Sequence, residues 1–141
     1  MQIKIKKLNP DAIIPRYALP GDAGMDLFSA EDVTIMPGER HPIATGLSIE
    51  LPEGFVSLIW DKSGIALKKG LMKMAGVIEH TYRGEYKILL LNTSKEEVEI
   101  KKGDKIAQLL VQPIVTAEII EVDKLSETDR GAGGFGSTGD K

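Results

Sequence analysis

The sequence contains no cysteine and only two histidines, His41 and His80. The absence of cysteine excludes disulfides, thiolate metal sites and cysteine nucleophiles, and it leaves the redox compartment open. Two histidines are too few for a metal cage built of several imidazoles. Any metal ion would therefore be held by oxygen ligands.

Aromatic residues are also scarce, with one tryptophan, three tyrosines and three phenylalanines among 141 residues. The core is therefore expected to consist mainly of Ile, Leu and Val, a composition that favours strands. A chain of this length is long enough for one domain with its own core and short for two.

The chain has no surplus of positive charge, because 18 Lys and Arg are interspersed with 21 Asp and Glu, for a formal net charge of -3. This pattern excludes the cationic face that binds a nucleic acid polymer. Neither the N-terminal residues 1–7 nor any later run has the apolar length of a signal peptide or a membrane span. We therefore expect a soluble, cytoplasmic protein with a small-molecule partner.

Alternation of apolar and polar residues recurs along the chain and predicts short, half-buried strands. The predicted strands cover residues 3–6, 33–35, 47–51, 55–60, 86–92, 98–101, 106–111 and 119–122. Helical periodicity is confined to Ser63–Lys69. The sequence thus predicts an all-β fold, a jelly-roll-like β-sandwich or barrel with at most one short helix.

The C-terminal segment from Arg130 to Gly139 is rich in glycine. Glycines allow backbone N–H groups to surround an anion, while Arg130 offers a cation and Phe135 a stacking surface. The segment predicts contact with a phosphate and a base. The alternative is a disordered terminus, which is the usual fate of such sequences.

Two internal segments also suggest ligand chemistry. Lys62, Ser63 and Gly64 stand where a strand gives way to a helical turn, a place that attracts phosphate. The alternative is that Ser63 is an ordinary N-cap and Lys62 is solvated. Farther on, an apolar run ends at Glu79, which could position water, and Tyr82 could pack against a sugar. The alternative is a strand end leading into a polar turn.

Taken in order, the segments resemble the five motifs of the trimeric dUTPase family. The similar stretches are residues 23–27, 62–66, 76–85, 103–109 and 130–139. Any one of them could arise by chance, but five in the right order with suitable gaps are a specific match. The resemblance covers the chain from about Pro20 to Gly139.

The resemblance implies a homotrimer whose three active sites are each assembled from neighbouring subunits. Residues 1–128 would form the β domain, and residues 129–141 would form a flexible glycine-rich arm that closes over the site. The implied reaction is hydrolysis of dUTP to dUMP and pyrophosphate by in-line attack of water on the α-phosphorus. Mg²⁺ would be held by the triphosphate and water, with no direct protein ligand and with Asp26 as a partner through water.

The same resemblance assigns a role to each matching residue. Glu79 would orient the attacking water and act as the catalytic residue. The implied substrate contacts are Lys62, Ser63, Gly64 and Gln108 to phosphates; Gly76, Val77 and Ile78 to the uracil edge; Tyr82 to deoxyribose, with Lys87 nearby; Arg130 to the γ-phosphate; Phe135 to the base; and Gly136, Ser137 and Thr138 around the phosphates.

Three departures from the family pattern concern residues with a predicted role in binding or catalysis. Glu79 occupies the position of the family's aspartate, Lys62 occupies that of its usual arginine, and the segment from Gly70 to Gly76 is shorter and lacks its usual asparagine.

Two other functions were considered. A dCTP deaminase would need a glutamate on the strand after the third motif, where the chain has residues 88–91, and a non-catalytic nucleotide-binding or regulatory trimer would keep the fold without turnover.

Overall fold

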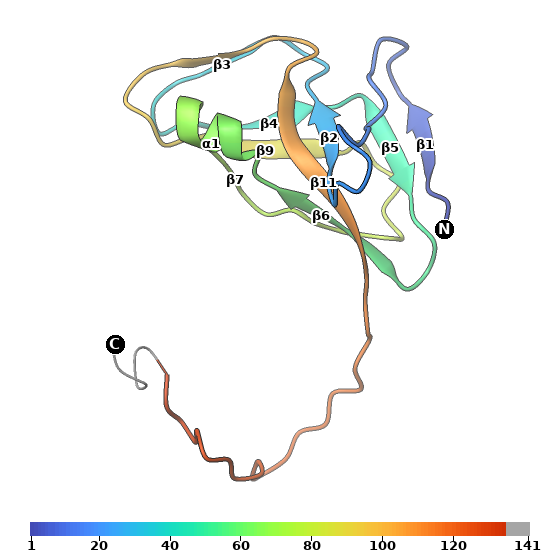
Figure 1. The fold of residues 1–141 in the computed structure, drawn as a ribbon, viewed down its shortest axis with the longest axis vertical. Helices are drawn as coiled ribbons and strands as arrows, with labels where there is room; N and C mark the ends of the chain where they lie inside the picture. The colour runs from blue at the N-terminus through green and yellow to red at the C-terminus, as the bar shows by residue number, and fades with distance from the viewer. Residues whose placement is uncertain (135–141) are drawn as a thin grey trace.

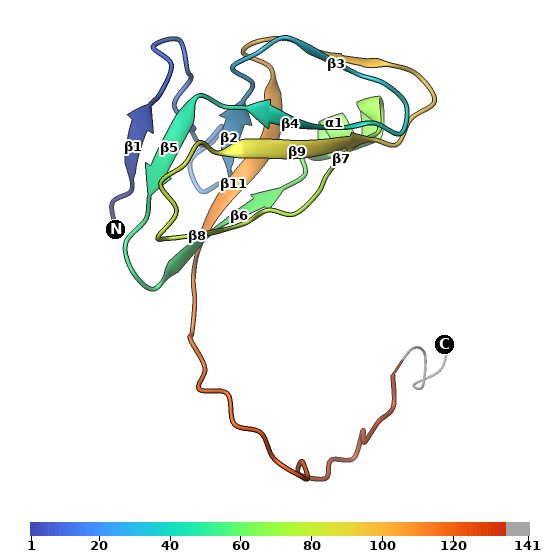
Figure 2. The same cartoon turned by 180° about the vertical axis from the view of Figure 1, so that it is seen from behind.

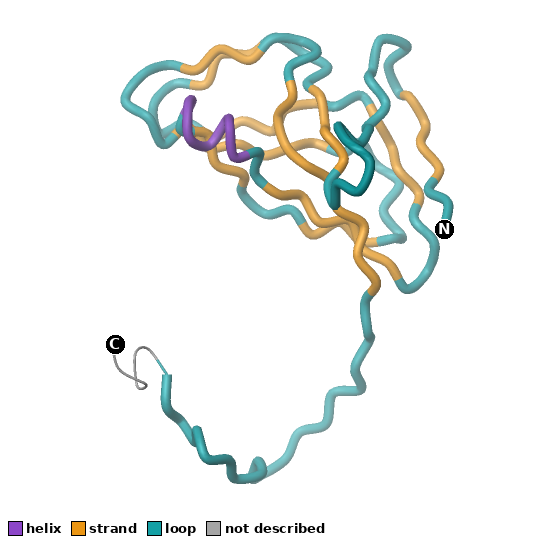
Figure 3. The backbone as a smooth tube through the Cα atoms, viewed as in Figure 1, coloured by secondary structure: helices purple, strands orange, loops and turns teal. Residues whose placement is uncertain are grey.

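The computed structural model describes residues 1–134, which form short strands and one short helix. Figure 3 shows that strands make up the body of the molecule. The elements are β1 Lys4–Lys7, β2 Met25–Phe28, β3 Val33–Ile35, β4 Arg40–Ala44, β5 Leu47–Glu50, β6 Phe55–Trp60, α1 Ser63–Lys69, β7 Leu71–Lys73, β8 Val77–Glu79, β9 Lys87–Asn92, β10 Val98–Ile100 and β11 Lys105–Pro113. The predicted helix and its bounds are confirmed.

All strand pairs are antiparallel, and they form four small sheets. The largest has the order β2-β11-β6-β8, the next has the order β4-β9-β7, and β1-β5 and β10-β3 form two-stranded sheets. Figures 1 and 2 show β11 running through the middle of the body, between β2 and β6. The predicted fold class, an all-β jelly-roll-like domain with one short helix, is confirmed.

The core is aliphatic, as the composition predicts. Its members come from most of the strands and include Leu27, Ile35, Ile43, Leu47, Ile49, Ile88, Leu90, Ile100, Ile106 and Leu109. Tyr86 is an aromatic residue that is fully buried among them. Within residues 1–134 no helix is long and apolar enough to cross a membrane.

Most of the predicted strands are present, with ends that differ from the predicted ones by at most two residues. Four strands, β2, β4, β7 and β8, were not among the predicted ones, and β8 was covered only by the alternative of a strand end at Glu79. All four residues of β2 are buried, so its sequence shows no alternation. β4 contains Pro42, which a sheet tolerates here because β4 is an edge strand. β7 has only three residues, too few for a period to be seen.

The strand predicted at residues 119–122 is wrong. After β11 the chain leaves the body as an extended arm (Figure 1), and Ile119 is 95% exposed. The last backbone hydrogen bond that joins the arm to the body runs from the Ile114 N–H to the Gly54 carbonyl, at 2.9 Å. A strand needs a neighbour for its backbone groups, and no described part of the chain lies beside residues 119–122.

Candidate functional site

The sheet register brings three predicted site residues together. On β11, Gln108 pairs with Asp26 of β2 on one side and with Trp60 of β6 on the other. The loop before β2 lies close to β11, because a Cβ atom at Gly24 would stand 3.1 Å from the Cβ of Gln108. Lys62 follows shortly after β6. The first, second and fourth motifs therefore meet at one end of the largest sheet.

Lys62 and Gln108 line an open cleft of about 510 Å³, which we call the lysine cleft. Its lining residues are Ala18, Asp22, Ala23, Gly24, Trp60, Asp61, Lys62, Gln108 and Leu110. Lys62 supplies a positive charge to this cleft and Gln108 an amide. Two carboxylates, Asp22 and Asp61, also line the cleft, and each accepts a backbone hydrogen bond, from Leu19 N–H and from Lys73 N–H. Lys62 and Gln108 are two side chains of the lining that can donate hydrogen bonds to an anion.

Asp26 is a buried carboxylate held between two lysines. Its side chain is 3% exposed; Lys62 Nζ donates a hydrogen bond to Oδ1 at 2.8 Å, and Lys105 Nζ lies 2.7 Å from Oδ2. Oδ2 accepts no well-directed hydrogen bond from residues 1–134, so this second contact is an ion pair. Burial by itself raises the pKa of Asp26, but the two neighbouring ammonium groups outweigh it and lower the pKa.

An ionised Asp26 therefore fixes the direction of the Lys62 side chain. The interpretation of Lys62 as a solvated residue is wrong. The interpretation of Ser63 as the N-cap is also wrong, because Lys62 occupies the N-cap position with extended backbone and without a side-chain cap. Ser63 and Gly64 are exposed in the first turn of α1, where backbone N–H groups have no acceptor within the helix.

The turn between β7 and β8 has an unusual backbone. Ala75 has φ 60°, and it is the one non-glycine residue with positive φ between residues 1 and 134; Gly76 follows with φ 121°. The Gly76 carbonyl accepts a hydrogen bond from Ile59 N–H at 2.8 Å. A Cβ atom at Gly76 would stand 2.9 Å from the carbonyl oxygen of Ile59, so this position excludes larger residues.

The two strands beside this turn belong to different sheets. β7 pairs with β9, whereas β8 pairs with β6. A small cavity of about 150 Å³ lies where they separate. It is lined by Ile59, Met74, Ala75, Gly76, Val77, Ile78, Lys87, Ile88 and Leu89. The cavity is mostly apolar and has backbone groups of the turn at its edge.

A second, larger cleft of about 910 Å³ lies beside β8, and we call it the tyrosine cleft. It is lined by Val77, Ile78, Glu79, Thr81, Tyr82, Glu85 and Lys87. Glu79 stands exposed at the end of β8, and a turn closed by the hydrogen bond from Tyr82 N–H to its carbonyl follows. The local structure at Glu79 is therefore a strand end followed by a polar turn, as the alternative interpretation predicted. Glu79 is at the same time one of the residues that line the cleft.

Tyr82 is held in place while it remains 45% exposed. Its hydroxyl donates to the Glu85 carbonyl at 3.1 Å, and its ring centroid lies 6.1 Å from that of Tyr86. A Cβ atom at Gly84 would collide with the Tyr82 hydroxyl. Gly84 is therefore needed for the position of this ring.

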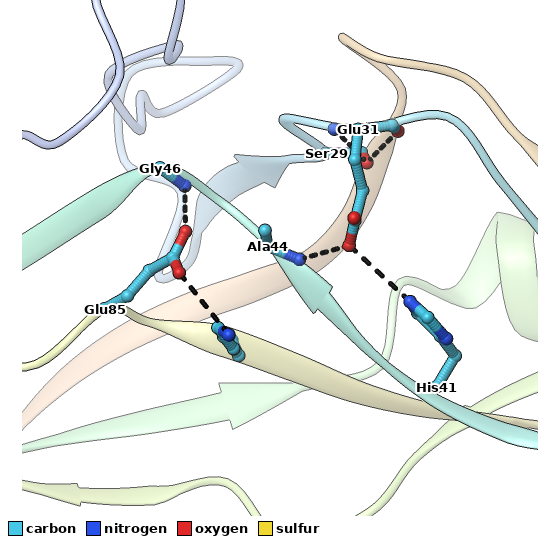
Figure 4. Close-up of polar contacts among 7 residues, drawn as sticks. Ser29, Glu31, His41, Ala44, Gly46 and Glu85 are labelled. Carbon is cyan, nitrogen blue, oxygen red and sulfur yellow. Dashed lines mark hydrogen bonds and ion pairs between the residues drawn. The ribbon is translucent and has the colours of Figure 1, made fainter.

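Glu85 anchors the wall of the tyrosine cleft. Its Oε1 atom accepts a hydrogen bond from Gly46 N–H at 2.9 Å, and its Oε2 atom lies 3.7 Å from Lys87 Nζ. Figure 4 shows that Glu85 and Glu31 approach the link between β4 and β5 from opposite sides. Glu31 accepts from Ala44 N–H at 2.8 Å, so two carboxylates fix this link.

Buried hydroxyl groups support the same wall. The Tyr86 hydroxyl lies 3.0 Å from Ser57 Oγ, and Thr45 Oγ1 donates to the Tyr86 carbonyl at 2.6 Å. Burial raises the pKa of Tyr86 above its ordinary value, so this phenol stays protonated. Tyr86, Ser57 and Glu85 could not be found from the sequence, because no local pattern shows that residues 29 or 39 positions apart meet.

The structure thus divides the predicted site residues into two sets. Asp26, Lys62 and Gln108 meet at the lysine cleft, with Ser63 and Gly64 following Lys62 in the chain. Val77, Ile78, Glu79, Tyr82 and Lys87 line the tyrosine cleft, and Gly76 lies at the small cavity beside it. The two large clefts share no lining residue.

Arg130 belongs to the arm that follows β11 and lines neither cleft. The predicted contacts Phe135, Gly136, Ser137 and Thr138 lie outside the described residues. Among residues 1–134 no group of three or more histidines, aspartates or glutamates is placed to hold a metal ion.

Comparison with known proteins identifies a single family. The sequence model of the dUTPase family matches residues 10–139. The deoxyuridine 5'-triphosphate nucleotidohydrolase of Nautilia profundicola is 54% identical over 141 residues, which cover 99% of both chains. The enzyme of the same name from Hydrogenobaculum sp. is 48% identical over 144 residues, covering 100% of both chains.

Solved structures agree with this result. The Staphylococcus bacteriophage 80alpha dUTPase with dUPNHPP superimposes with a TM-score of 0.92 at 32% identity, covering 98% of each chain. A mutant dUTPase from phage phi11 of S. aureus superimposes with a TM-score of 0.84 at 29% identity, covering 90% of this chain and 100% of that one. The latter is described as revealing the coordination of a structural Mg(II) ion.

Proposed function

Since the chain belongs to the dUTPase family, we propose that it hydrolyses dUTP to dUMP and pyrophosphate. The observation that carries this proposal is the grouping of the family motifs into a cleft with a lysine and an amide and a cleft with an exposed tyrosine and a carboxylate. A nucleoside triphosphate needs both kinds of surface, one for its phosphates and one for its sugar and base. Removal of dUTP from the nucleotide pool, in the cytoplasm, is the proposed role.

The lysine cleft binds the phosphate chain in this proposal. Lys62, held by Asp26, supplies charge, and Gln108 supplies an amide from the neighbouring strand. Ser63 and Gly64 contribute the unsatisfied N–H groups of the first helical turn. Binding here would hold the scissile phosphorus in line with the attacking water, which is the main source of rate in phosphoryl transfer.

The turn at Gly76 and the tyrosine cleft bind the nucleoside. The backbone of Gly76, Val77 and Ile78 contacts the uracil edge beside the small cavity, and Tyr82 packs against the deoxyribose. Lys87, paired with Glu85, lies at the same wall. A ring fixed against the sugar leaves no room for a 2′-hydroxyl, which favours a deoxynucleotide.

Glu79 is the proposed catalytic residue. Its exposed carboxylate accepts a proton from the attacking water as the water oxygen bonds to the α-phosphorus. The bond from the α-phosphorus to the bridging oxygen breaks, and pyrophosphate leaves with both electrons of that bond. No covalent intermediate with the protein is formed.

Mg²⁺ fits this site as an ion carried by the substrate. The two oxygens of Asp26, the buried carboxylate beside the lysine cleft, face lysines, so the chain offers no open set of direct ligands there. Bound Mg²⁺ would neutralise charge on the phosphates and on the leaving pyrophosphate. Asp26 would face the ion only through water.

We propose that the complete site forms in a homotrimer. The two clefts have separate linings, and Arg130 of the arm lines neither of them, so one subunit does not enclose a nucleotide. Arm residues 115, 119, 120, 122 and 125 are apolar and exposed, which suits a segment that packs on a neighbouring subunit. The division into a domain of residues 1–128 and a lid of residues 129–141 remains a prediction for that assembly.

The deaminase hypothesis has no support in the structure, because β9, the strand after the third motif, carries no carboxylate. The hypothesis of a non-catalytic binding protein has no observation in its favour. The test is to incubate the purified protein with Mg²⁺ and each deoxynucleoside triphosphate in turn, and to measure pyrophosphate, inorganic phosphate and ammonia. Pyrophosphate released from dUTP alone supports the proposal, and its absence contradicts it.

The role of Glu79 has its own test. We expect Glu79→Gln to lower kcat by about 10²–10⁴-fold while leaving dUTP affinity nearly unchanged, because only the proton acceptor is lost. Glu79→Asp keeps the carboxylate, tests the effect of side-chain length, and serves as the matched control. Full activity of Glu79→Gln would remove Glu79 from the mechanism.

A further inference from the structure

Lys73 lies over the turn that the proposed function assigns to the base. Its Nζ atom donates a hydrogen bond to the Ala75 carbonyl at 2.8 Å and lies 5.4 Å from the centroid of the Trp60 ring. The same Nζ atom is 3.4 Å from the position that a Cβ atom at Gly76 would take. The ammonium group thus lies against the Ala75–Gly76 turn.

The main chain of Lys73 is fixed as well. Its N–H donates to Asp61 Oδ1 at 2.6 Å, and the N–H of the next residue, Met74, donates to the Leu89 carbonyl at 2.8 Å. Asp61 directly precedes Lys62, which lines the lysine cleft. Lys73 therefore connects the segment that faces the phosphates to the turn that faces the base.

The turn needs such a support, because Ala75 has positive φ. A non-glycine residue adopts this conformation only where surrounding contacts hold it. A hydrogen bond to the Ala75 carbonyl fixes the orientation of the peptide between Ala75 and Gly76. The hydrogen bond from the Ile59 N–H to the Gly76 carbonyl fixes the next peptide.

We propose that Lys73 is a positioning residue for base selection. Its ammonium group holds the left-handed Ala75–Gly76 turn, and the turn in turn aims the backbone groups of residues 76–78 at the base. Uracil has a hydrogen-bond donor at N3 and an acceptor at O4, whereas cytosine has an acceptor at N3 and a donor at N4. Backbone groups can distinguish these two edges only when the direction of each group is fixed. This inference rests on the proposed function for the identity of the ligand.

The test compares Lys73→Met, which removes the ammonium group, with Lys73→Arg, which keeps a donor. We expect Lys73→Met to raise KM for dUTP and to reduce the ratio of kcat/KM for dUTP over dCTP about tenfold, as small misplacements of binding groups do. Lys73→Arg should retain most of this ratio. Lys6→Met, which changes an exposed lysine of β1 in the same way, should alter neither value.

A second substitution separates positioning from direct contact. Glycine adopts positive φ without strain, so Ala75→Gly in the Lys73→Met background should restore part of the lost selectivity. Loss of selectivity without restoration would mean that Lys73 contacts the nucleotide itself, which would overturn the positioning role. Unchanged selectivity in Lys73→Met would overturn the inference outright.

Binding measurements make the inference independent of turnover. Trp60 is the only tryptophan of the chain, so its fluorescence should change in Lys73→Met without any nucleotide, and an unchanged spectrum would contradict the contact. Affinities for dUMP and dCMP, measured by calorimetry, should differ in the wild-type protein and converge in Lys73→Met. A wild-type protein that prefers dUMP but does not hydrolyse dUTP would refute the proposed function and leave this inference standing.

Discussion

The paired lysines around Asp26 lead to a prediction about stability and its dependence on pH. Asp26→Asn would leave two ammonium groups beside a buried amide of nearly the same size. Removing one partner of a buried ion pair costs about 3–5 kcal/mol. The side chains of Lys62 and Lys105 are 27% and 42% exposed, so both ammonium groups can reach water after the change. We therefore expect the free energy of unfolding to fall by about 1–3 kcal/mol.

The pH dependence of this difference follows from the lowered pKa of Asp26. A carboxyl group with a lower pKa in the folded state stabilises the protein above its unfolded pKa of about 3.9, and this stabilisation is lost as pH falls through the folded pKa. The gap in stability between wild type and Asp26→Asn should therefore stay constant from about pH 7 to pH 5 and close below about pH 4.

Thermal unfolding at a fixed protein concentration measures this gap, since the stability of an oligomer depends on concentration. For a chain of this size we expect Tm to fall by roughly 3–10 °C at pH 7. Glu53→Gln, at an exposed position without an ion pair in the described part of the chain, is the control and should leave Tm unchanged. A gap that persists undiminished at pH 3 would show that the charge of Asp26 is not its source.

Two further predictions concern the tyrosine cleft and the arm. Gly84→Ala should raise KM for dUTP about tenfold or more, because its Cβ atom displaces the Tyr82 ring, and Tyr82→Phe should keep most of the affinity because the ring stays in place. Unchanged steady-state kinetics of Gly84→Ala would refute the assigned position of Tyr82. Deleting residues 130–141 should reduce kcat/KM and leave the trimer intact by light scattering, and dissociation of the truncated protein would contradict the lid assignment.

Local patterns in the sequence were sufficient for most of the secondary structure. Strand 55–60 was predicted with its observed ends, because its residues are bounded by a Pro-Glu-Gly turn and a charged pair. The strand at 119–122 was predicted by the same reasoning and is absent, since an apolar pattern states only that a segment needs a partner. No segment within residues 1–134 pairs with residues 119–122, which extend into solvent instead.

The candidate site could be predicted only in part. The motifs carry residue types suited to phosphate and sugar binding, so Glu79, Tyr82 and Lys62 could be proposed as site residues from the sequence, and the structure places them at the two clefts. Their supports were not: Asp61 and Glu85 act on backbone groups 12 and 39 positions away in the chain, through pairings that only the folded sheets create.

From the sequence alone, most of the strands, the helix, the aliphatic core and the family could be predicted. Each of these depends on local periodicity, on composition or on residue types in a fixed order. The tertiary structure decided which motifs share a cleft, that Asp26 directs Lys62, and that the main chain of Lys73 is held by Asp61 while its ammonium group lies near Trp60. Those facts depend on sheet register and long-range contacts, which are set by the packing of the whole chain and leave no trace in any short stretch of sequence.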